Sequence, residues 1–401
     1  MINALLVTLI ALVLAYVLSE VMRHLRLPGV VGQISAGIIL GIPFIREYIL
    51  NEEVISIFNY IANIGIILMF FFVGLEISFA AFRRNLKESV YVSFFNTIIP
   101  LAIGFVVMKY LFSFDTLTSL IIGIALAVSA QAISLDILQE MKLIKSRVGT
   151  IIMESGTVDD VFELLLISVL LIAFHATTFQ GLNLINLLID IVIFAVIVIV
   201  FKSILIPYTL KMCEADKSRS NLFMGALMVV LLMAYLSEVF GIGSLIGALV
   251  AGILMRQTFL SSQDRKPWRK TELSHSVHAI SFGFLIPLFF VNVGLQADLS
   301  ALSSNLWLVL VLILIDLLGT VFGSVIGVLL SGGTLREGFI VGWGVSPKGD
   351  TELVIASLAL NKGLISVDIY TAIITVALIT TFVAPIVFKF LVKRHAPGEK
   401  K

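Results

Sequence analysis

Long apolar stretches recur along the whole chain and are separated by short polar segments. An α-helix needs about 20 apolar residues to cross the hydrocarbon core of a bilayer. The pattern predicts an all-α polytopic membrane protein with about thirteen transmembrane helices. The predicted spans are 2–21, 29–45, 55–79, 89–112, 116–140, 148–174, 182–210, 219–240, 241–258, 275–297, 303–330, 335–361 and 368–392. Residues 1–395 are therefore expected to form a single membrane transporter domain, followed by a short cytoplasmic tail at 396–401.

Composition supports this class of protein. Hydrophobic residues make up 59% of the chain and charged residues 13%, whereas soluble globular domains have roughly 25% charged residues. The net charge of +1 gives no support for nucleic-acid binding, and a single cysteine excludes an internal disulfide. The connections between spans leave no room for a soluble catalytic or nucleotide-binding domain.

Basic residues predict the orientation. One set of alternate loops is rich in Lys and Arg, whereas the other set holds only Arg46, Lys109 and Lys362. By the positive-inside rule the rich loops are cytoplasmic. The N-terminus is then outside and the C-terminus inside a cell membrane (the inner, cytoplasmic membrane), which requires an odd number of spans.

Two segments of the first half recur in the second. Gly32–Gly41 (GQISAGIILG) resembles Gly247–Met255 (GALVAGILM), and Ile66–Phe79 resembles Leu285–Leu299. An odd number of predicted spans separates the copies, so they would have opposite orientations. Inverted-topology repeats of this kind are typical of secondary transporters; a chance match in so apolar a chain is the alternative interpretation.

Corresponding spans of the two halves are also interrupted by polar and helix-breaking residues. Leu126–Leu138 (LAVSAQAISLDIL) lies within the fifth predicted span, and Gly342–Ala356 (GWGVSPKGDTELVIA) lies within the twelfth. Irregular backbone is tolerated at membrane depth only inside protein or beside a water-filled cavity. These segments are therefore predicted to be discontinuous helices near an ion site, and two kinked packing helices are the alternative.

An acidic cluster lies in the sixth predicted span, in the sequence ESGTVDDVFELLL. At about 100° per residue, Asp159, Asp160 and Glu163 share one side of the helix, whereas Glu154 points elsewhere. Intramembrane acids are costly and commonly functional. Carboxylates so close together would bind either protons or a cation, and competition between the two, combined with alternating access, gives antiport. A purely structural set of ion pairs is the alternative, but Lys348 and Lys202 are too few to neutralise the intramembrane acids Asp159, Asp160, Glu163, Asp316, Asp350 and Glu352.

These segments, taken in order, resemble the cation:proton antiporter-2 family of prokaryotic Na⁺/H⁺ and K⁺/H⁺ exchangers. The resemblance rests on LPGVVGQISAGIILG, FFFVGLEISF, VDDVFELLL, GSLIGALVAGILM, IPLFFVNVGLQADL and GVSPKGDTELVIASLAL. It implies two inverted six-helix repeats joined by helix 7, with discontinuous helices 5 and 12 crossing in an ion-transporting core formed by helices 4–6 and 11–13. Helices 1–3 and 8–10 would form the dimer domain of a homodimer, and the core would move against it like an elevator.

The resemblance also assigns roles to residues. Asp160 would carry the cation and the proton, and Asp159 would be its neighbour; Glu163, Gln131 and Ser129 complete the expected binding site. Gln131 stands where family members often have a hydroxyl residue, and Glu163 stands where they usually have a small one. The charge-compensating residues expected at the broken helices are Lys348, Asp350, Glu352, Asp316 and Thr320, with Thr320 at the position of a family lysine.

The sequence thus predicts a transporter rather than an enzyme, without a cofactor. It would exchange a monovalent cation, Na⁺ ahead of K⁺, for protons in pH homeostasis. A proton- or sodium-coupled symporter of a small organic anion on a related fold is the alternative, because Lys348 and half-helix N-termini could hold an anion. An intramembrane aspartyl protease would need two distant acids and a G-x-G-D signature, for which the chain offers only PKGD.

Overall fold

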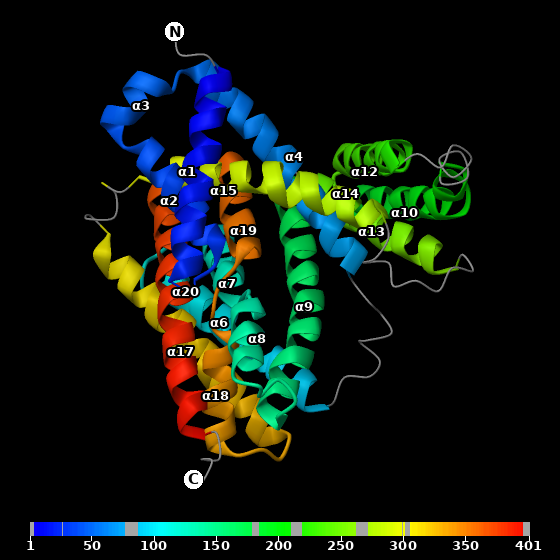
Figure 1. Ribbon diagram of the computed structural model, residues 1–401. Helices are drawn as coiled ribbons and strands as arrows, with labels where there is room; N and C mark the ends of the chain where they lie inside the picture. Colours follow the sequence, from blue (N-terminus) through cyan, green and yellow to red (C-terminus); the bar gives the residue numbers. More distant parts are fainter. Residues whose placement is uncertain are drawn as a thin grey trace. The chain divides into compact units, whose positions relative to one another are not determined.

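The regular structure is helical throughout the part of the chain that the computed structural model describes, which is residues 4–25, 27–76, 87–178, 184–209, 219–261, 272–298, 300 and 305–395 (Figure 1). No strand occurs in these residues, and the all-α fold class is confirmed. The helices are α1 (Ala4–His24), α2 (Gly29–Gly41), α3 (Pro43–Ile49), α4 (Glu52–Glu76), α6 (Lys87–Tyr110), α7 (Thr116–Ala127), α8 (Ala132–Glu140), α9 (Arg147–Thr178), α10 (Leu184–Val200), α12 (Arg219–Val239), α13 (Ser244–Ser261), α14 (Glu272–Ile280), α15 (Ile286–Leu295), α17 (Leu306–Leu330), α18 (Leu335–Val345), α19 (Asp350–Asn361) and α20 (Val367–His395), with π-helical turns η1 (Phe201–Leu205) and η3 (Ser281–Leu285).

Within the described residues, eight helical segments are long and apolar enough to cross a bilayer. They are Ala4–His24, Glu52–Glu76, Lys87–Tyr110, Val192–Thr209, Asn221–Val239, His275–Leu295, Leu306–Leu330 and Val367–Arg394. Shorter apolar helices cover Thr116–Ala127, Ser244–Thr258 and Thr351–Asn361. These segments fit a multi-pass membrane protein, and the full count of thirteen spans stays a prediction.

The predicted span at 29–45 contains a break that the apolar pattern did not indicate. Helix α2 ends at Gly41 and α3 begins at Pro43, with a bend of 79° between them. A residue before proline is pushed out of the α region by the proline ring, and Ile42 accordingly has φ −56° and ψ 129°. The apolar pattern continues across this point and so conceals the break.

The chain divides into two compact units. The first comprises Met1–Tyr16, Ile42–Ser78 and Ser168–Gly294, and the second comprises Val17–Gly41, Phe79–Ile167 and Leu295–Lys401. The acids and the polar segments that the sequence singled out all fall in the second unit. The assignment of core and dimer roles to helices stays a prediction.

Glycines on α17 allow close packing against α6 in the second unit. A Cβ added to Gly323 would lie 2.3 Å from the Phe95 carbonyl oxygen, and one added to Gly327 would lie 2.6 Å from the Val92 Cα. Small residues let helix backbones approach in membranes, where lipid tails remove the hydrophobic drive for association. Helix α6 is thus held directly against α17 along the length that carries the polar residues described below.

The sequence repeat has a counterpart in local packing. In the second unit, Ser19 donates a hydrogen bond to the Gly29 carbonyl oxygen at 2.8 Å, and a Cβ on Gly32 would lie 2.4 Å from the Leu18 backbone. In the first unit, Ser237 donates a hydrogen bond to a backbone carbonyl oxygen at 2.8 Å. A Cβ added to Gly247 would lie 2.4 Å from a second backbone carbonyl oxygen. In both copies, therefore, a serine donates to a backbone carbonyl oxygen and a glycine packs closely against a neighbouring backbone.

Both predicted interruptions lie between helices. Helix α7 ends at Ala127 and α8 begins at Ala132, while α18 ends at Val345 and α19 begins at Asp350. The two non-helical segments touch, because the Ala130 N–H donates to the Pro347 carbonyl oxygen at 2.7 Å. A Cβ on Gly349 would lie 2.5 Å from the Ala130 Cβ, so only glycine fits at this approach. Four helix ends therefore meet in one place inside the second unit.

Candidate cation and proton site

Asp159 accepts hydrogen bonds from four side chains of the described residues. It lies on α9 with 2% of its surface exposed. Its carboxylate accepts hydrogen bonds from Ser93 Oγ at 2.5 Å, Asn96 Nδ2 at 3.4 Å and Ser129 Oγ at 3.4 Å, and also from the Gln131 side-chain amide. A buried carboxylate requires such donors because water no longer solvates it. Four uncharged side chains from two other segments thus converge on one acid.

Ser93 and Asn96 belong to the site although sequence reasoning did not select them. Both are buried on α6, and Thr97 donates to Asn96 Oδ1 at 3.1 Å, which leaves the amide N–H₂ for Asp159. The sequence does contain a pattern that indicates these two residues. Ser89, Ser93 and Asn96 follow one another at intervals of four and three residues in an apolar span, the spacing of one helix face.

The three predicted acids do not all point the same way. Glu163 is 7% exposed and accepts a hydrogen bond at 2.9 Å from the backbone N–H of Ser129, in the break between α7 and α8. Asp160, by contrast, has an exposed side chain. Positions four apart share a helix face and adjacent positions do not, so α9 buries Asp159 with Glu163 and turns Asp160 outward. Glu154 stands apart, as predicted, and accepts from Ser89 Oγ at 3.1 Å.

Gln131 contacts both Asp159 and the α9 backbone. A Cβ added to Gly156 would lie 2.2 Å from Gln131 Oε1, so the glycine provides the space that this amide occupies. Gln131 Oε1 and Thr320 Oγ1 are buried oxygens without a hydrogen-bond partner among the described residues. The polar cluster therefore contains neutral oxygens that could serve as further ligands.

We expect Gly156→Ala to lower stability by displacing Gln131 from Asp159. A hydrogen bond to a charged group contributes about 1.5–3 kcal/mol, and the loss should appear as a lower thermal midpoint in detergent. In a Gln131→Ala background the clash is absent. The same Gly156→Ala change should then stabilise by up to about 1 kcal/mol, because alanine has the higher helix propensity. An equal loss in both backgrounds would contradict the contact.

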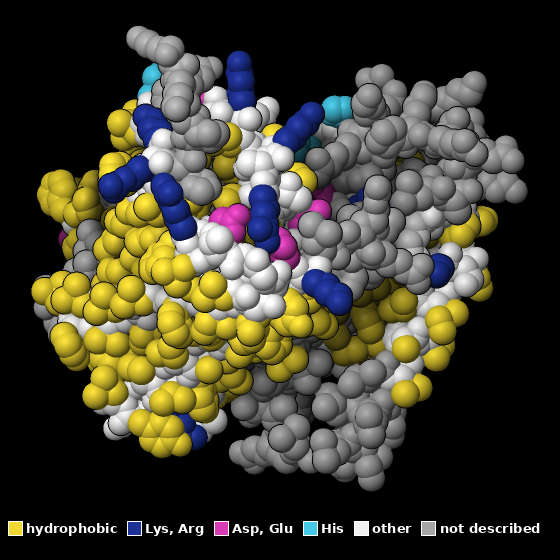
Figure 2. All heavy atoms as spheres, turned by 90° about the horizontal axis from the view of Figure 1, so that it is seen from below, with side chains coloured by type: hydrophobic (Ala, Val, Ile, Leu, Met, Phe, Trp, Pro, Cys, Tyr) yellow, Lys and Arg dark blue, Asp and Glu magenta, His cyan; other side chains and the backbone are white. Residues whose placement is uncertain are grey.

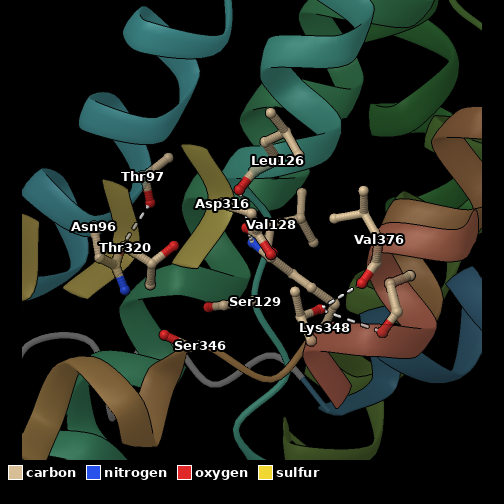
Figure 3. A network of polar contacts seen from close by, with 12 residues as sticks. Asn96, Thr97, Leu126, Val128, Ser129, Asp316, Thr320, Ser346, Lys348 and Val376 are labelled. Carbon is tan, nitrogen blue, oxygen red and sulfur yellow. Dashed lines mark hydrogen bonds and ion pairs between the residues drawn. The ribbon is translucent and has the colours of Figure 1, made fainter. Parts of the chain in front are cut away.

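Lys348 lies in the other break and forms a separate buried ion pair. Its Nζ is 2.7 Å from Asp316 Oδ1 on α17 and donates to the carbonyl oxygens of Leu126 and Val128, each at 2.6 Å. Figure 3 shows the side chain reaching toward these three residues. The carbonyls lie at the C-terminal end of α7, the negative end of the helix dipole, where a cation is favoured. Lys348 thus compensates the end of one broken helix from the break in the other.

Three further residues, Glu352, Thr320 and Asp350, were predicted to compensate charge at the helix breaks. Glu352 is fully buried on the first turn of α19, and its two carboxylate oxygens have no hydrogen-bond partner among the described residues. Thr320 lies on α17 one turn after Asp316 and beside Asn96 (Figure 3). The Asp350 side chain lies outside the described residues. In the described part of the chain, no three His, Cys, Asp or Glu side chains are arranged to hold a metal ion.

Apolar helices, two touching helix breaks and buried charges beside them are the features of a secondary transporter, in which ion sites lie at discontinuous helices. Comparison with known proteins identifies the family. Residues 8–394 match the family model described as sodium/hydrogen exchanger, transmembrane. The chain therefore belongs to the sodium/hydrogen exchanger family, which confirms the predicted cation:proton antiporter resemblance and the prediction of a transporter rather than an enzyme.

Individual relatives are similar to this chain over nearly its full length. The chain is 26% identical to a Na(+)/H(+) antiporter of Enterococcus hirae, over 94% of each chain. It is 28% identical to the Na(+)/H(+)-K(+) antiporter GerN of Bacillus cereus, over 90% of this chain and 89% of GerN. The solved structure of the sodium proton antiporter MjNhaP1 from Methanocaldococcus jannaschii has a similar fold, with a TM-score of 0.70 at 18% identity, over 98% of this chain and 97% of that chain.

Proposed function

We propose that this protein exchanges a monovalent cation for protons across a cell membrane, with Na⁺ as the expected cation and K⁺ as the alternative. The observation that carries the proposal is the convergence of Ser93, Asn96, Ser129 and Gln131 on the buried carboxylate of Asp159. Asp160 follows directly in the chain and is exposed. The relatives named as Na⁺/H⁺ and Na⁺/H⁺-K⁺ antiporters support the same reaction.

Asp160 is the proposed exchanging acid because a carboxylate that transports must meet water and ions. Asp159 is the proposed neighbour that fixes the site, and Glu163 and Ser129 hold the α7–α8 break against α9. A cation stripped of water requires several oxygen ligands, and carboxylate together with neutral oxygens suits hard cations. Protonation of the same oxygens removes the charge that attracts the cation. Proton and cation therefore cannot occupy the site together, and this exclusion couples their movements in opposite directions.

The transport cycle that we propose is elevator-like alternating access. A core domain with crossed discontinuous helices 5 and 12 would carry the site, and a dimer domain would anchor it in a homodimer with the N-terminus outside and the C-terminus cytoplasmic. The contact between Ala130 and Pro347 supports a core that moves as one body, because it links the two breaks directly.

A cation series on reconstituted protein tests the function. In proteoliposomes with an imposed pH gradient, Na⁺ or K⁺ should dissipate the gradient, and choline should not. Li⁺ and Rb⁺ rank the selectivity, and Ca²⁺ tests whether only monovalent ions are accepted. Gradient dissipation by small organic anions, without any response to the alkali cations, would instead favour the symporter alternative and overturn the proposal.

We also expect exchange to be electroneutral, with one proton for one cation. The hydrogen-bond partners of Asp159 among the described residues are all uncharged, and Lys348 is engaged by Asp316 instead. Because no described lysine contacts Asp159, there is no base beside it that would release a second proton when the cation binds. A potential-sensitive dye in sealed proteoliposomes should therefore report no potential during Na⁺-driven proton movement, and a potential that depends on Na⁺ would contradict this stoichiometry.

Thr320→Lys, which adds a positive charge near Asp159, tests whether the lack of a lysine there makes exchange electroneutral. Thr320 is buried beside Asn96, within the region that contacts Asp159. A lysine there would supply the missing base, and exchange should become sensitive to membrane potential. Thr320→Met is the matched control, because it adds comparable length without charge and should leave the exchange electroneutral.

A further inference from the structure

An apolar groove of about 580 Å³ lies on the second unit, between α6, α17 and α18. Its lining is apolar and includes Leu314, Leu318 and Phe322, whose side chains are 56%, 61% and 60% exposed. Along α17 the lining extends from Leu314 to Val325, a helical rise of roughly 16 Å. One leaflet of the hydrocarbon core is about 15 Å thick, so the groove has the length of an acyl chain within one leaflet.

A second pocket of about 670 Å³ lies next to this groove, at the end of the unit where α18 begins and α20 ends. The two cavities share Leu335 and Phe339 in their linings. The second pocket is also lined by Arg336 and Arg394. Figure 2, which views this end directly, shows several Lys and Arg side chains, with Asp and Glu side chains among them, over a belt of hydrophobic side chains. The apolar groove and a pocket lined by two arginines are therefore adjacent.

Among the described residues, Arg336 and Arg394 differ from Arg147 and Lys389 in forming no ion pair with a carboxylate. Arg147, at the same end, is 2.8 Å from Glu88 and 3.6 Å from Glu337, and Lys389 is 3.4 Å from Glu140. Arg336 donates to the carbonyl oxygen of Arg394 at 3.1 Å, but neither arginine forms an ion pair with a described carboxylate. Both side chains are exposed. Within the described residues, their positive charge is not neutralised by an ion pair.

We propose that the groove and the pocket together bind one anionic phospholipid. Its phosphate would lie between Arg336 and Arg394, and one acyl chain would lie in the groove against Leu318 and Phe322. Basic pockets between transmembrane helices at a membrane surface bind anionic headgroups, and the guanidinium group matches phosphate geometry. A free phosphate would use the arginines but not the groove, and a neutral lipid would use the groove but not the arginines. Because the groove and the arginine-lined pocket adjoin at Leu335 and Phe339, a ligand with both parts is favoured.

Native mass spectrometry of the delipidated full-length protein tests the proposal. The probes are phosphatidylglycerol, phosphatidylcholine and soluble glycerol phosphate. The unmodified protein should retain phosphatidylglycerol in preference to phosphatidylcholine and should not retain glycerol phosphate. In Arg336→Gln/Arg394→Gln, binding of phosphatidylglycerol should weaken by roughly thirtyfold, from the loss of two surface cations, and the preference should disappear. Leu318→Trp, which fills the groove, should weaken binding of the lipid while both arginines remain.

Matched variants separate these effects from those of losing any surface charge, adding any bulky side chain, or misfolding. Lys142→Gln/Lys145→Gln removes two exposed cations outside the pocket, and Leu310→Trp places the same bulk on an exposed position of α17 outside the groove. Both should bind phosphatidylglycerol as the unmodified protein does, and all variants should elute as single species. An unchanged preference in the double arginine variant would overturn the proposal. So would retention of glycerol phosphate equal to that of the lipid, or full binding by Leu318→Trp.

Discussion

Asp160→Asn is expected to reduce Na⁺-driven proton movement in proteoliposomes to the level of liposomes without protein. Asparagine preserves the size of the side chain but can neither bind a proton in exchange nor balance the charge of a cation. Because the Asp160 side chain is exposed, the change should cost little stability, and the thermal midpoint should stay close to that of the unmodified protein. The measurement is the relaxation of an imposed pH gradient after addition of Na⁺.

Asp136→Asn is the matched control for this experiment. Asp136 is an exposed acid on α8 in the same unit, and its loss should leave exchange unchanged. If Asp160→Asn exchanged as fast as Asp136→Asn, Asp160 could not be the acid that carries the ion.

Lys348→Met is expected to cause the largest loss of stability, about 3–5 kcal/mol, the usual cost of removing one partner of a buried ion pair. The change would leave Asp316 buried without its cation, and the carbonyl oxygens of Leu126 and Val128 without their donor. The measurement is the thermal unfolding midpoint in detergent. Lys348→Arg should keep most of the stability, because it keeps the positive charge.

A surface lysine provides the comparison. Lys389 pairs with Glu140 at 3.4 Å, and the Glu140 side chain is 52% exposed. Exposed pairs contribute about 0–1 kcal/mol, so Lys389→Met should lower the midpoint only slightly. Equal effects of Lys348→Met and Lys389→Met would mean that the buried pair does not hold the helix breaks together.

Much of this fold could be predicted from the sequence because the bilayer restricts the alternatives. Long apolar runs must be helical there, and polar residues with Pro347 and Gly349 inside such runs indicate where helices break. The break at Ile42 was not predicted. Its proline lies between apolar residues, and hydropathy does not distinguish a helix that bends from one that continues. Long-range contacts such as that between Ala130 and Pro347 depend on packing, which no local pattern specifies.

The sequence predicted which residues belong to the site better than it predicted which of them contact one another. The sequence identified Asp159, Gln131 and Ser129, and the structure brings them within hydrogen-bond distance. It also identified Lys348 and Asp316 as compensating charges but could not show that they pair with each other. These residues lie 32 positions apart on different segments. Serine and asparagine also line helix interfaces for packing alone, which is why Ser93 and Asn96 were not selected.

The proposed exchange requires a cation and a proton to compete for one carboxylate site. The most direct test is the apparent KM for Na⁺, measured as a function of pH in proteoliposomes at zero membrane potential. Competition predicts that the KM rises by roughly tenfold for each pH unit on the acidic side, where protons occupy the site, while the maximal rate at saturating Na⁺ stays nearly constant. A KM that does not change with pH, with activity lost through the maximal rate alone, would show that proton and cation bind independently and would contradict the account.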